Sequence, residues 1–316
     1  MKRTITTVRH ALSGIASFIP GVKRYTPKGT GGTDSARYCY SVWLRHLAMA
    51  ETNGLNTYPR VVAELGPGDS LGIGLAALIS GVDKYFAFDI VEHADTERNL
   101  QIFEELVSLF RNRVDVPRED EFPNLKPYLE TYKFPRRILM DDRLSRALED
   151  DRIERIKNSI RDRNYHNPVL EYRVPWFDPL VIGERSVDMI YSQAVLEHVD
   201  DLSNTYRAMH SWLKPGGYIS HMIDFKCHKT ADEWNGHWTY SDLTWKLIRG
   251  KRSYLLNREP HSTHLKLLLE EGFKVVCDQT IKSKSPITKR SLSGRFRNMS
   301  DEDLTTTDAF IQAIKE

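Results

Sequence analysis

The feature that most constrains the fold is an alternation of short apolar runs with helix-like segments that extends from Val61 almost to the end of the chain. The apolar runs are RVVAEL, KYFAFDI, PVLEYRV, SVDMIYS, GGYISHMIDF, FKVVCDQ and DAFIQAIK. Helical patterns lie between several of them, at residues 70–79, 201–213 and 260–271. Apolar strands that alternate with helices are typical of a mostly parallel sheet with helices on both faces. The sequence therefore predicts an α/β fold.

Length and composition exclude several classes of protein. The 316 residues, of which 40% are hydrophobic, suffice for one large core. No apolar run approaches the roughly 18 residues that a membrane span requires, and the start lacks the pattern of a signal peptide, so we expect a cytoplasmic protein. Cys39, Cys227 and Cys277 lie far apart without paired metal spacing, which argues against a disulfide framework and against a zinc site.

The formal net charge is only +2, but two blocks of the chain are purely basic. The first contains Lys2, Arg3, Arg9, Lys23, Arg24 and Lys28, and the second contains Lys282, Lys284, Lys289, Arg290, Arg295 and Arg297. Such blocks are usually solvated surface, but they can also hold phosphate or anionic lipid. The first block overlaps the amphipathic stretch TVRHALSGIASFI, which could pack on the protein itself or lie on the inner face of a membrane.

Two segments stand outside the regular alternation. Residues 1–58 are expected to form an N-terminal helical lid, in which a helix through Trp43 and Leu47 begins with Thr33 or Asp34 as its N-cap. Residues 93–167 are highly charged and much longer than an ordinary crossover, so they are expected to form a helical insertion after the second strand. The remaining chain, residues 59–316, is expected to form one domain that contains this insertion.

The stretch ELGPGDS forms the connection between the first strand and the helix that follows it. In such sheets, ligands bind beyond the carboxyl ends of the strands. Gly66 and Gly68 permit a tight turn and a close approach of the backbone to a ligand. Asp89 ends the second strand roughly 20 residues later, where an acid can accept hydrogen bonds from both hydroxyls of a ribose. A helix cap or a surface acid is the alternative for Asp89. Together these features indicate a nucleoside cofactor.

Four motifs in this order, E-x-G-x-G, the acid that ends strand two, LEHV and LKPGG, resemble the class I S-adenosylmethionine-dependent methyltransferases, of the type that includes ubiquinone and menaquinone methyltransferases. The resemblance covers Val61 to Lys315 apart from the insertion. It implies a Rossmann-like sheet of seven strands, mostly parallel, whose antiparallel last strand near Ala309–Ile314 enters between strands five and six. It also implies S-adenosylmethionine as the cofactor.

The resemblance assigns the cofactor to particular residues. Glu64, Gly66 and Gly68 would line its methionine and ribose side, Asp89 would bind the ribose hydroxyls, and Ile90 would lie against adenine. Ser192 and Gln193, at the end of strand four, would face the sulfonium. The complete set of expected cofactor residues is Glu64, Leu65, Gly66, Pro67, Gly68, Ser70, Asp89, Ile90, Ser192 and Gln193.

Methyl transfer to a hydroxyl requires loss of a proton, and candidate groups cluster in SHMIDFKCH at the end of strand five. His221 or His228 could act as the base with Asp224 orienting it, since a neutral imidazole accepts a proton near pH 7. The same three side chains could instead bind a divalent metal, which we do not favour, or merely shape the loop. His198 in LEHV is expected to structure the strand-helix corner.

A looser resemblance covers HWTYSDLTWKLIRGKRSYLLNREPHSTHLKLLLEEGF, which is similar to the acceptor side of methyltransferases encoded among bacterial surface-polysaccharide and glycan-modification genes. It makes Asn257 and Arg258 candidate substrate contacts, with Arg258 able to fork two hydrogen bonds to a carboxylate or phosphate. An ordinary salt bridge is the alternative for Arg258. Trp238 could form an apolar wall for a sugar ring, or pack in the core.

These features together predict O-methylation of a glycan or glycan precursor, with an anionic acceptor because the second basic block would emerge at the cofactor edge. N-methylation, or methylation of another small-molecule or lipid acceptor, is the main alternative. RNA methylation is not favoured, since no RNA-binding module is recognisable. A non-catalytic cofactor-binding partner is also not favoured because the motifs are intact. The sequence does not indicate an oligomeric state.

Overall fold

We describe the protein from a computed structural model, which describes residues 2–19, 31–93, 95–162, 166–176, 178–252 and 255–316. Within these residues, seven strands form one sheet in the order β3-β2-β1-β4-β5-β7-β6. The strands are β1 (Val61–Leu65), β2 (Lys84–Phe88), β3 (Leu170–Arg173), β4 (Val187–Gln193), β5 (Leu213–Asp224), β6 (Phe273–Lys282) and β7 (Thr306–Lys315). Strand β7 is antiparallel to both of its neighbours and the other pairs are parallel, which confirms the predicted topology.

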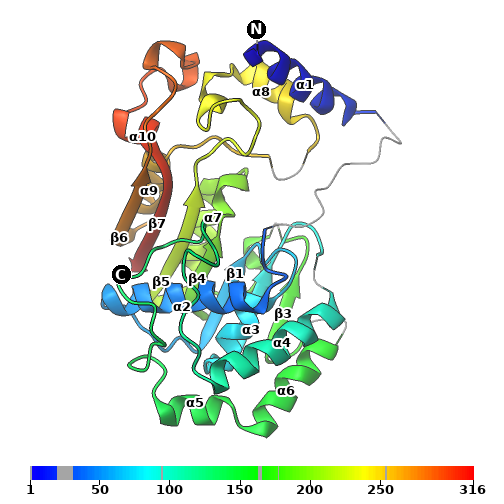
Figure 1. The fold of residues 1–316 in the computed structure, drawn as a ribbon, viewed down its shortest axis with the longest axis vertical. Coiled ribbons are helices and arrows are strands. Elements are labelled where there is room, and N and C mark those ends of the chain that lie inside the picture. Colours follow the sequence, from blue (N-terminus) through cyan, green and yellow to red (C-terminus); the bar gives the residue numbers. More distant parts are fainter. Residues whose placement is uncertain (1, 20–30, 94, 163–165, 177, 253–254) are drawn as a thin grey trace.

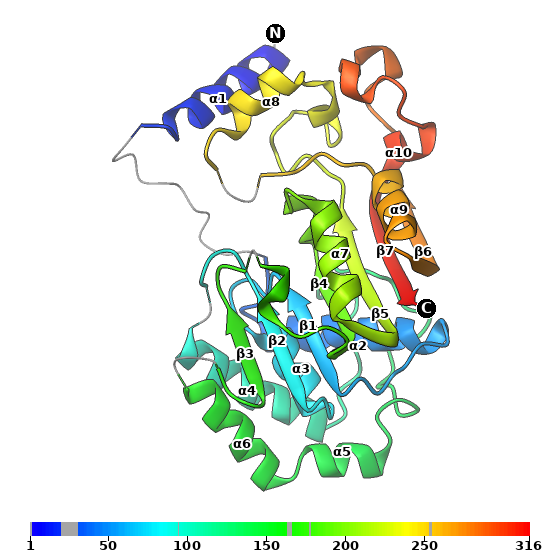
Figure 2. The same ribbon diagram turned by 180° about the vertical axis from the view of Figure 1, so that it is seen from behind.

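Helices cover both faces of the sheet (Figures 1 and 2). Helices α2 (Ala36–Thr52), α3 (Gly72–Ile79) and α4 (Thr96–Arg111) cover one face, and α7 (Leu202–Trp212) and α9 (His261–Glu270) cover the other. Successive strand residues serve opposite faces: Val62 and Tyr85 belong to the core under α2 and α3, whereas Ala63 and Phe86 belong to the core under α7. Burial on both faces explains why these strands are continuously apolar.

The segment between β2 and β3 is helical only in part. Helix α4 begins it, and α5 (Asp141–Ala147) and α6 (Asp150–Arg161) follow. Residues 112–140, which we expected to be helical, contain neither helix nor strand. Pro117, Pro123, Pro127 and Pro135 interrupt this stretch, and proline breaks a helix interior. The buried Arg45 of α2 anchors it by donating hydrogen bonds to the carbonyl oxygens of Pro117 and Pro127.

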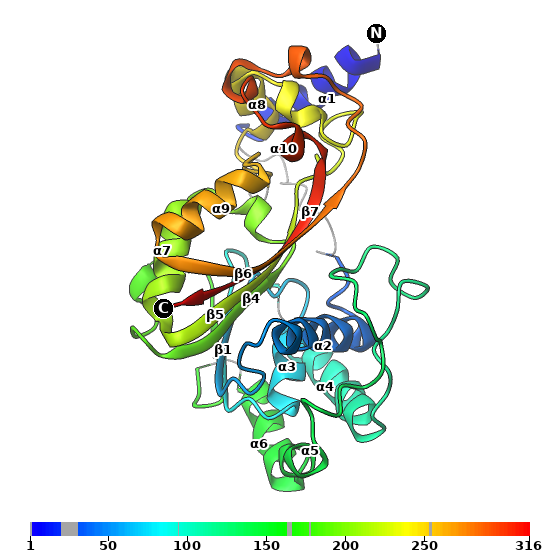
Figure 3. The same cartoon turned by 90° about the vertical axis from the view of Figure 1, so that its left-hand side faces the viewer.

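The N-terminal segment divides into two helices with different surroundings. Helix α2 lies in the core, and its N-cap is Ser35 rather than the expected Thr33 or Asp34. Helix α1 (Lys2–Ala16) packs instead on α8 (Asp242–Arg249), beyond the carboxyl ends of the parallel strands (Figure 3), where α10 (Asp301–Thr305) also lies at the end of the sheet. Gly14 allows this contact, since a Cβ atom there would lie 1.9 Å from the carbonyl oxygen of Leu247. Among the helices described, none has the length and apolar character needed to span a membrane.

Candidate active site

The carboxyl ends of four neighbouring strands bring the predicted motifs to one edge of the sheet. The glycine turn follows β1, Asp89 follows β2, Gln193 ends β4 and Asp224 ends β5. These strands are adjacent in the order β2-β1-β4-β5. The topology therefore confirms that the glycine turn and the acid of the second strand lie next to each other.

The turn after β1 requires glycine for reasons of conformation and of space. Gly66 has φ +63° and Gly68 has φ +76°, a region that other residues rarely adopt. The Gly66 N–H donates to the carbonyl oxygen of Phe88 over 2.8 Å, which ties the turn to β2. A Cβ atom on Gly66 would lie only 2.6 Å from Cγ2 of Val195. The space beside Gly66 is thus filled by Val195 itself, whereas we had expected it to be reserved for a ligand.

Ser70 connects the turn to the N-terminal segment. Its hydroxyl donates to the carbonyl oxygen of Thr33, and its backbone N–H donates to the Thr33 hydroxyl over 3.3 Å. The Ser70 hydroxyl also accepts the N–H of Gly72 at the start of α3, over 3.0 Å. Ser70 is fully buried, so its side chain positions the turn and the preceding segment.

Glu64 lies in the core rather than at the open edge. Its Oε2 accepts hydrogen bonds from the hydroxyls of Tyr85 and Tyr191, which lie on the neighbouring strands β2 and β4. Burial raises the pKa of Glu64 to about 8, although the two tyrosine hydroxyls oppose the shift. This carboxyl group therefore links β1 to β2 and β4 through hydrogen bonds on the face of the sheet that α3 covers.

Asp89 and Ile90 form a polar and apolar pair at the end of β2. Asp89 Oδ1 accepts the Ile90 N–H over 2.7 Å. Burial raises the pKa of Asp89, while backbone N–H groups of Ile90 and Val91 oppose the rise. The Ile90 side chain is 36% exposed, which is unusual for a large apolar residue so close to the core. The pair suits a ligand that has a hydroxylated ring beside an apolar one.

The two predicted residues at the end of β4 have different surroundings. Ser192 is fully buried, and its hydroxyl lies 2.8 Å from Nδ1 of His221. Gln193 is partly exposed and donates through Nε2 to the carbonyl oxygen of Lys126 over 3.3 Å. Gln193 Oε1 is buried, and the Gln193 side chain lies near enough to His46 to oppose the lowering of the pKa of that imidazole. The amide group of Gln193 is thus engaged within the protein.

The structure does not bring His221 together with Asp224 and His228. Residues three apart in a strand point to opposite faces, and His221 lies fully buried on the face that α9 covers. Burial, together with the nearby His46 and His264, lowers the pKa of His221 to about 3. An imidazole in these surroundings has neither the access nor the basicity that a general base near pH 7 requires.

Asp224 and His228 do lie together, at the open end of β5. His228 Nε2 is 3.2 Å from Asp224 Oδ2, and Lys226 Nζ is 2.9 Å from Asp224 Oδ1. Burial alone would raise the pKa of Asp224, but the hydrogen bond from His228 and the positive charge of Lys226 lower it to about 2. His228 has φ +44° and a side chain that is 36% exposed. The pair has the arrangement expected of a base and the group that orients it.

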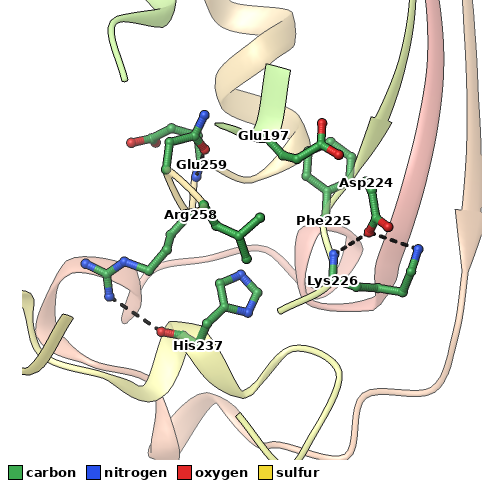
Figure 4. A pocket seen from close by; sticks show the side chains of 9 residues that line it. Glu197, Asp224, Phe225, Lys226, His237, Arg258 and Glu259 are labelled. Atoms are coloured by element: carbon green, nitrogen blue, oxygen red, sulfur yellow. Dashed lines mark hydrogen bonds and ion pairs between the residues drawn. The ribbon is translucent and has the colours of Figure 1, made fainter. Parts of the chain in front are cut away.

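Glu197, which our sequence analysis did not single out, lies beside this pair. It belongs to the LEHV motif, whose three-residue turn η2 (Leu196–His198) follows β4. Burial, and then the negative charge of Asp224, raise the pKa of Glu197 well above its ordinary value. A cavity of about 10 Å³, room for roughly one water molecule, is lined by Glu197, Asp224, Phe225, Lys226, His237, Leu256, Asn257, Arg258 and Glu259 (Figure 4).

Asn257 and Arg258, the predicted substrate contacts, are engaged within the protein. Asn257 Nδ2 donates to the carbonyl oxygens of Leu196 and Val199, over 2.7 and 2.9 Å, and so holds the LEHV turn. The buried Arg258 guanidinium lies 2.7 Å from Asp242 Oδ1 and points away from Glu197 in Figure 4. The salt bridge that we considered for Arg258 is therefore present. Its arginine side chain is buried, whereas its partner Asp242 is exposed.

Trp238 packs in the core instead of forming an open wall for a sugar. Its side chain is 1% exposed, and its indole N–H donates to the carbonyl oxygen of Arg258 over 3.0 Å. Large aromatic side chains lose the most from exposure to water, and the sequence pattern cannot distinguish a core tryptophan from a ligand wall. Core packing, the alternative that we considered, is what the structure shows.

The second basic block emerges at the carboxyl edge, because β6 runs parallel to β5. Half of its charges are compensated: Lys282 pairs with Glu302, Lys289 with Asp301, and Arg295 with Glu259. The other three cations are exposed and make no ion pair with a described residue; they are Lys284, Arg290 and Arg297. In the N-terminal block, Lys23, Arg24 and Lys28 lie outside the described residues.

Comparisons with known proteins identify the family of the chain. A family model described as "Methyltransferase domain" matches residues 56–278. No curated protein matches the chain. Solved structures that match include an S-adenosylmethionine-dependent methyltransferase from Mesorhizobium loti, with 15% identity, 81% of this chain and 91% of that chain covered, and a TM-score of 0.39. A putative sarcosine dimethylglycine methyltransferase from Galdieria sulphuraria matches with 13% identity, coverage of 87% and 85%, and a TM-score of 0.43.

A third solved structure is the Haemonchus contortus phosphoethanolamine N-methyltransferase 2 in complex with phosphomonomethylethanolamine and S-adenosylhomocysteine; it shows 13% identity, coverage of 86% of this chain and 52% of that chain, and a TM-score of 0.41. The left-handed glycine turn and the Asp89–Ile90 pair beside it fit the adenosyl cofactor of this family. The chain belongs to the methyltransferase domain family, and it is a class I S-adenosylmethionine-dependent methyltransferase.

Proposed function

We propose that this methyltransferase transfers the methyl group to a hydroxyl of a glycan or glycan precursor that carries negative charge. The observation that supports it best is the contact between His228 and Asp224 at the carboxyl end of β5, 3.2 Å between Nε2 and Oδ2. An amine acceptor can attack without help once it is neutral, whereas a hydroxyl needs a group that takes its proton. A partly exposed imidazole held by a carboxylate suits a hydroxyl acceptor.

Bound S-adenosylmethionine supplies a methyl group that is already activated by its positive sulfur. The residues of this chain bind, orient and remove a proton. Asp89 would hold the ribose hydroxyls, and the glycine turn lets the backbone approach them. Asp224 stays ionised because its pKa lies near 2, so it can hold the Nε2 proton of His228. Nδ1 of the same ring is then the nitrogen that accepts the proton of the acceptor hydroxyl.

The charge of the carboxyl edge supports an anionic acceptor. Lys284, Arg290 and Arg297 are exposed cations in the loop between β6 and β7, and no described acid compensates them. Cations at such an edge raise the local concentration of an anionic substrate and can bind its phosphate or carboxylate. A phosphorylated glycan, a uronic glycan and a lipid-phosphate-linked saccharide all have this chemistry.

Helices α1 and α8 support contact with a membrane on the same side of the molecule. They lie side by side and expose large apolar side chains, which are Val8, Leu12, Ile15, Phe18, Ile19, Leu243 and Leu247. The cations Arg9, Lys246 and Lys251 are also exposed there. Apolar residues flanked by cations favour binding to anionic lipid. Leu12→Asp should therefore weaken cosedimentation with anionic vesicles, whereas Leu269→Asp, on the distant α9, should not.

The acceptor is tested by transfer of labelled methyl groups to fractionated cell-envelope extracts. We expect label in acidic glycan or glycan-lipid fractions, in a methyl ether that survives mild alkali. His228→Ala should lower kcat by about 10²- to 10⁴-fold, the usual contribution of a general base, with cofactor affinity retained. His166→Ala, on the far side of the sheet, is the control. Label found only in amines, aromatic compounds or RNA would refute the proposal.

A further inference from the structure

The carboxyl group of Glu197 is buried without a partner. Its residue is 3% exposed, and neither Oε1 nor Oε2 makes a hydrogen bond to a described residue. The backbone N–H groups of Glu197 and Asp224 oppose the rise in the pKa of this carboxyl group, but burial outweighs them. Buried carboxylates in proteins are almost always paired, hydrogen-bonded or bound to a metal ion, because burying an uncompensated charge is costly. A cation bound beside Glu197 would compensate the ionised carboxylate, which no described side chain does.

Two imidazoles lie within reach of this carboxyl group. Glu197, His198 and His228 can each offer one ligand atom, and these three atoms all lie within 4.8 Å of one another. The rings of His198 and His228 are close, with centroids 5.1 Å apart. One ion can therefore contact all three groups after small side-chain adjustments.

The neighbouring acid already orients one of these imidazoles. Asp224 Oδ2 lies 3.2 Å from Nε2 of His228, which leaves Nδ1 of that ring as the nitrogen that can bind a metal. Metal-binding histidines almost always have such a partner on the second nitrogen. Lys226, which pairs with both Asp224 and Asp308, keeps Asp224 in this position.

We propose that Glu197, His198 and His228 form a binding site for one divalent transition-metal ion at the carboxyl ends of β4 and β5. Two imidazoles and one carboxylate suit Zn²⁺, Co²⁺ and the neighbouring first-row ions, and three protein ligands leave positions open for a further ligand. Mg²⁺ prefers oxygen ligands and should bind poorly. The site differs from the one that the sequence suggested, because His221 is excluded and Glu197 takes part.

The site would have a direct use in the proposed reaction, on which this part of the inference rests. A hydroxyl oxygen bound at an open position of the metal ion loses its proton more readily, as metal-bound water does. The proton would pass to solvent or to a neighbouring base, and the oxygen would then form a bond to the methyl carbon as the methyl–sulfur bond breaks and S-adenosylhomocysteine leaves. With the metal ion bound, His228 is a ligand positioned by Asp224 and not the base; the role of His228 as general base given above applies to the protein without metal.

Metal binding is measured on the full-length protein after treatment with a chelator, without reference to methyl transfer. The protein is titrated with Co²⁺, and binding is monitored by the visible absorption of the Co²⁺ complex. We expect one equivalent to bind with a spectrum typical of low coordination number. Zn²⁺ should displace the bound Co²⁺. Glu197→Gln and His228→Asn should each weaken binding at least ~100-fold, since loss of even an indirect partner typically costs 10- to 100-fold. Glu259→Gln is the matched control, because Glu259 lines the same cavity but pairs with Arg295.

The results separate this inference from the proposed function. Absence of a stoichiometric Co²⁺ complex in the wild-type protein, or equal affinity in Glu197→Gln, His228→Asn and wild type, would overturn the metal site whatever the acceptor. Circular dichroism of both variants checks that they are folded, and asparagine at position 228 suits the left-handed backbone there. A protein that binds Co²⁺ as expected but methylates only amines would leave the site intact and refute the glycan acceptor.

Discussion

At the scale of single residues, the glycine turn shows how the fold and the cofactor edge depend on each other. Gly66 combines a left-handed backbone with a contact to Val195 that leaves no room for a Cβ atom. Val195 directly precedes the LEHV turn. The glycine turn and the residue before the LEHV turn, far apart in the chain, therefore restrict each other.

Gly66→Ala should lower the free energy of unfolding by about 2–4 kcal/mol, from the left-handed backbone and from the clash with Val195. Adding Val195→Ala should recover the part that is due to the clash, so the two changes should be non-additive in urea unfolding. Gly216→Ala is the control: it has a similar φ, +76°, but a Cβ atom there would meet nothing. Additive effects would show that the contact is not significant.

Asp89→Asn should weaken the binding of S-adenosylhomocysteine by about 10- to 100-fold, because two charge-assisted hydrogen bonds to the ribose become neutral ones. Calorimetric titration measures the affinity, and the unfolding midpoint should change little. Asp83→Asn is a suitable control, since Asp83 pairs with Arg60 at the opposite edge of the sheet. Equal affinity in Asp89→Asn and wild type would place the ribose elsewhere.

At the scale of elements, the segment before α9 secures the turn after β4. Asn257 Nδ2 donates to the carbonyl oxygens of Leu196 and Val199, and Oδ1 accepts the Glu259 N–H. The backbone N–H of Asn257 donates to the backbone carbonyl oxygen of Glu197. Arg258 then joins α8 through Asp242 and lies over the rings of Trp245 and Phe296. The residues expected to contact substrate thus connect the acceptor-side elements to the sheet.

Asn257→Ala should lower the free energy of unfolding by about 1–3 kcal/mol, because two partly buried carbonyl oxygens lose their donor. Asn257→Asp should cost more, since an oxygen would then face both carbonyl groups. Asn204→Ala, at an exposed position of α7, should stay within about 0.5 kcal/mol. Denaturant unfolding gives all three values. If Asn257→Ala left the free energy of unfolding unchanged, the LEHV turn would be stable without these two hydrogen bonds.

At the scale of the whole molecule, four buried histidines make the fold sensitive to acid. Burial is the largest cause that lowers the pKa of each to about 3; they are His46, His221, His237 and His264. In the unfolded chain the same groups titrate near pH 6.5. The unfolded state therefore binds more protons at pH 3–6.5, so the stability is present above about pH 6.5 and is lost as the pH falls below it.

Each of these histidines should contribute about 1.4 kcal/mol of lost stability per pH unit in that window. Urea midpoints measured from about pH 7 down to about pH 5 should fall steeply. His264→Gln, which keeps a partner for the Tyr206 hydroxyl, should remove about a quarter of the slope. His166→Gln should leave the slope unchanged because that side chain is 61% exposed. A flat profile in the wild type would contradict the burial of the four rings.

Much of the fold follows from local pattern. Each predicted strand is present, with its limits shifted by only a few residues, because alternation of apolar runs and helices depends on spacing along the chain. The order of the strands came with the resemblance to the methyltransferases, and the structure confirms it. Residues 112–140 are the exception: their four prolines already argued against helix, and the prediction gave more weight to the charge pattern.

What the sequence determined by itself is the set of groups at the carboxyl edge, because strand ends in a parallel sheet must meet there. What only the tertiary structure decided is which side chains face that edge. His221 and Asp224 differ by an odd number of strand positions, so one is buried under α9 and the other is open. The sequence also does not show whether Trp238 and Arg258 are buried or exposed, because burial depends on contacts between segments far apart in the chain. Glu197 gains its significance only from the absence of a partner, which is a property of the packed structure.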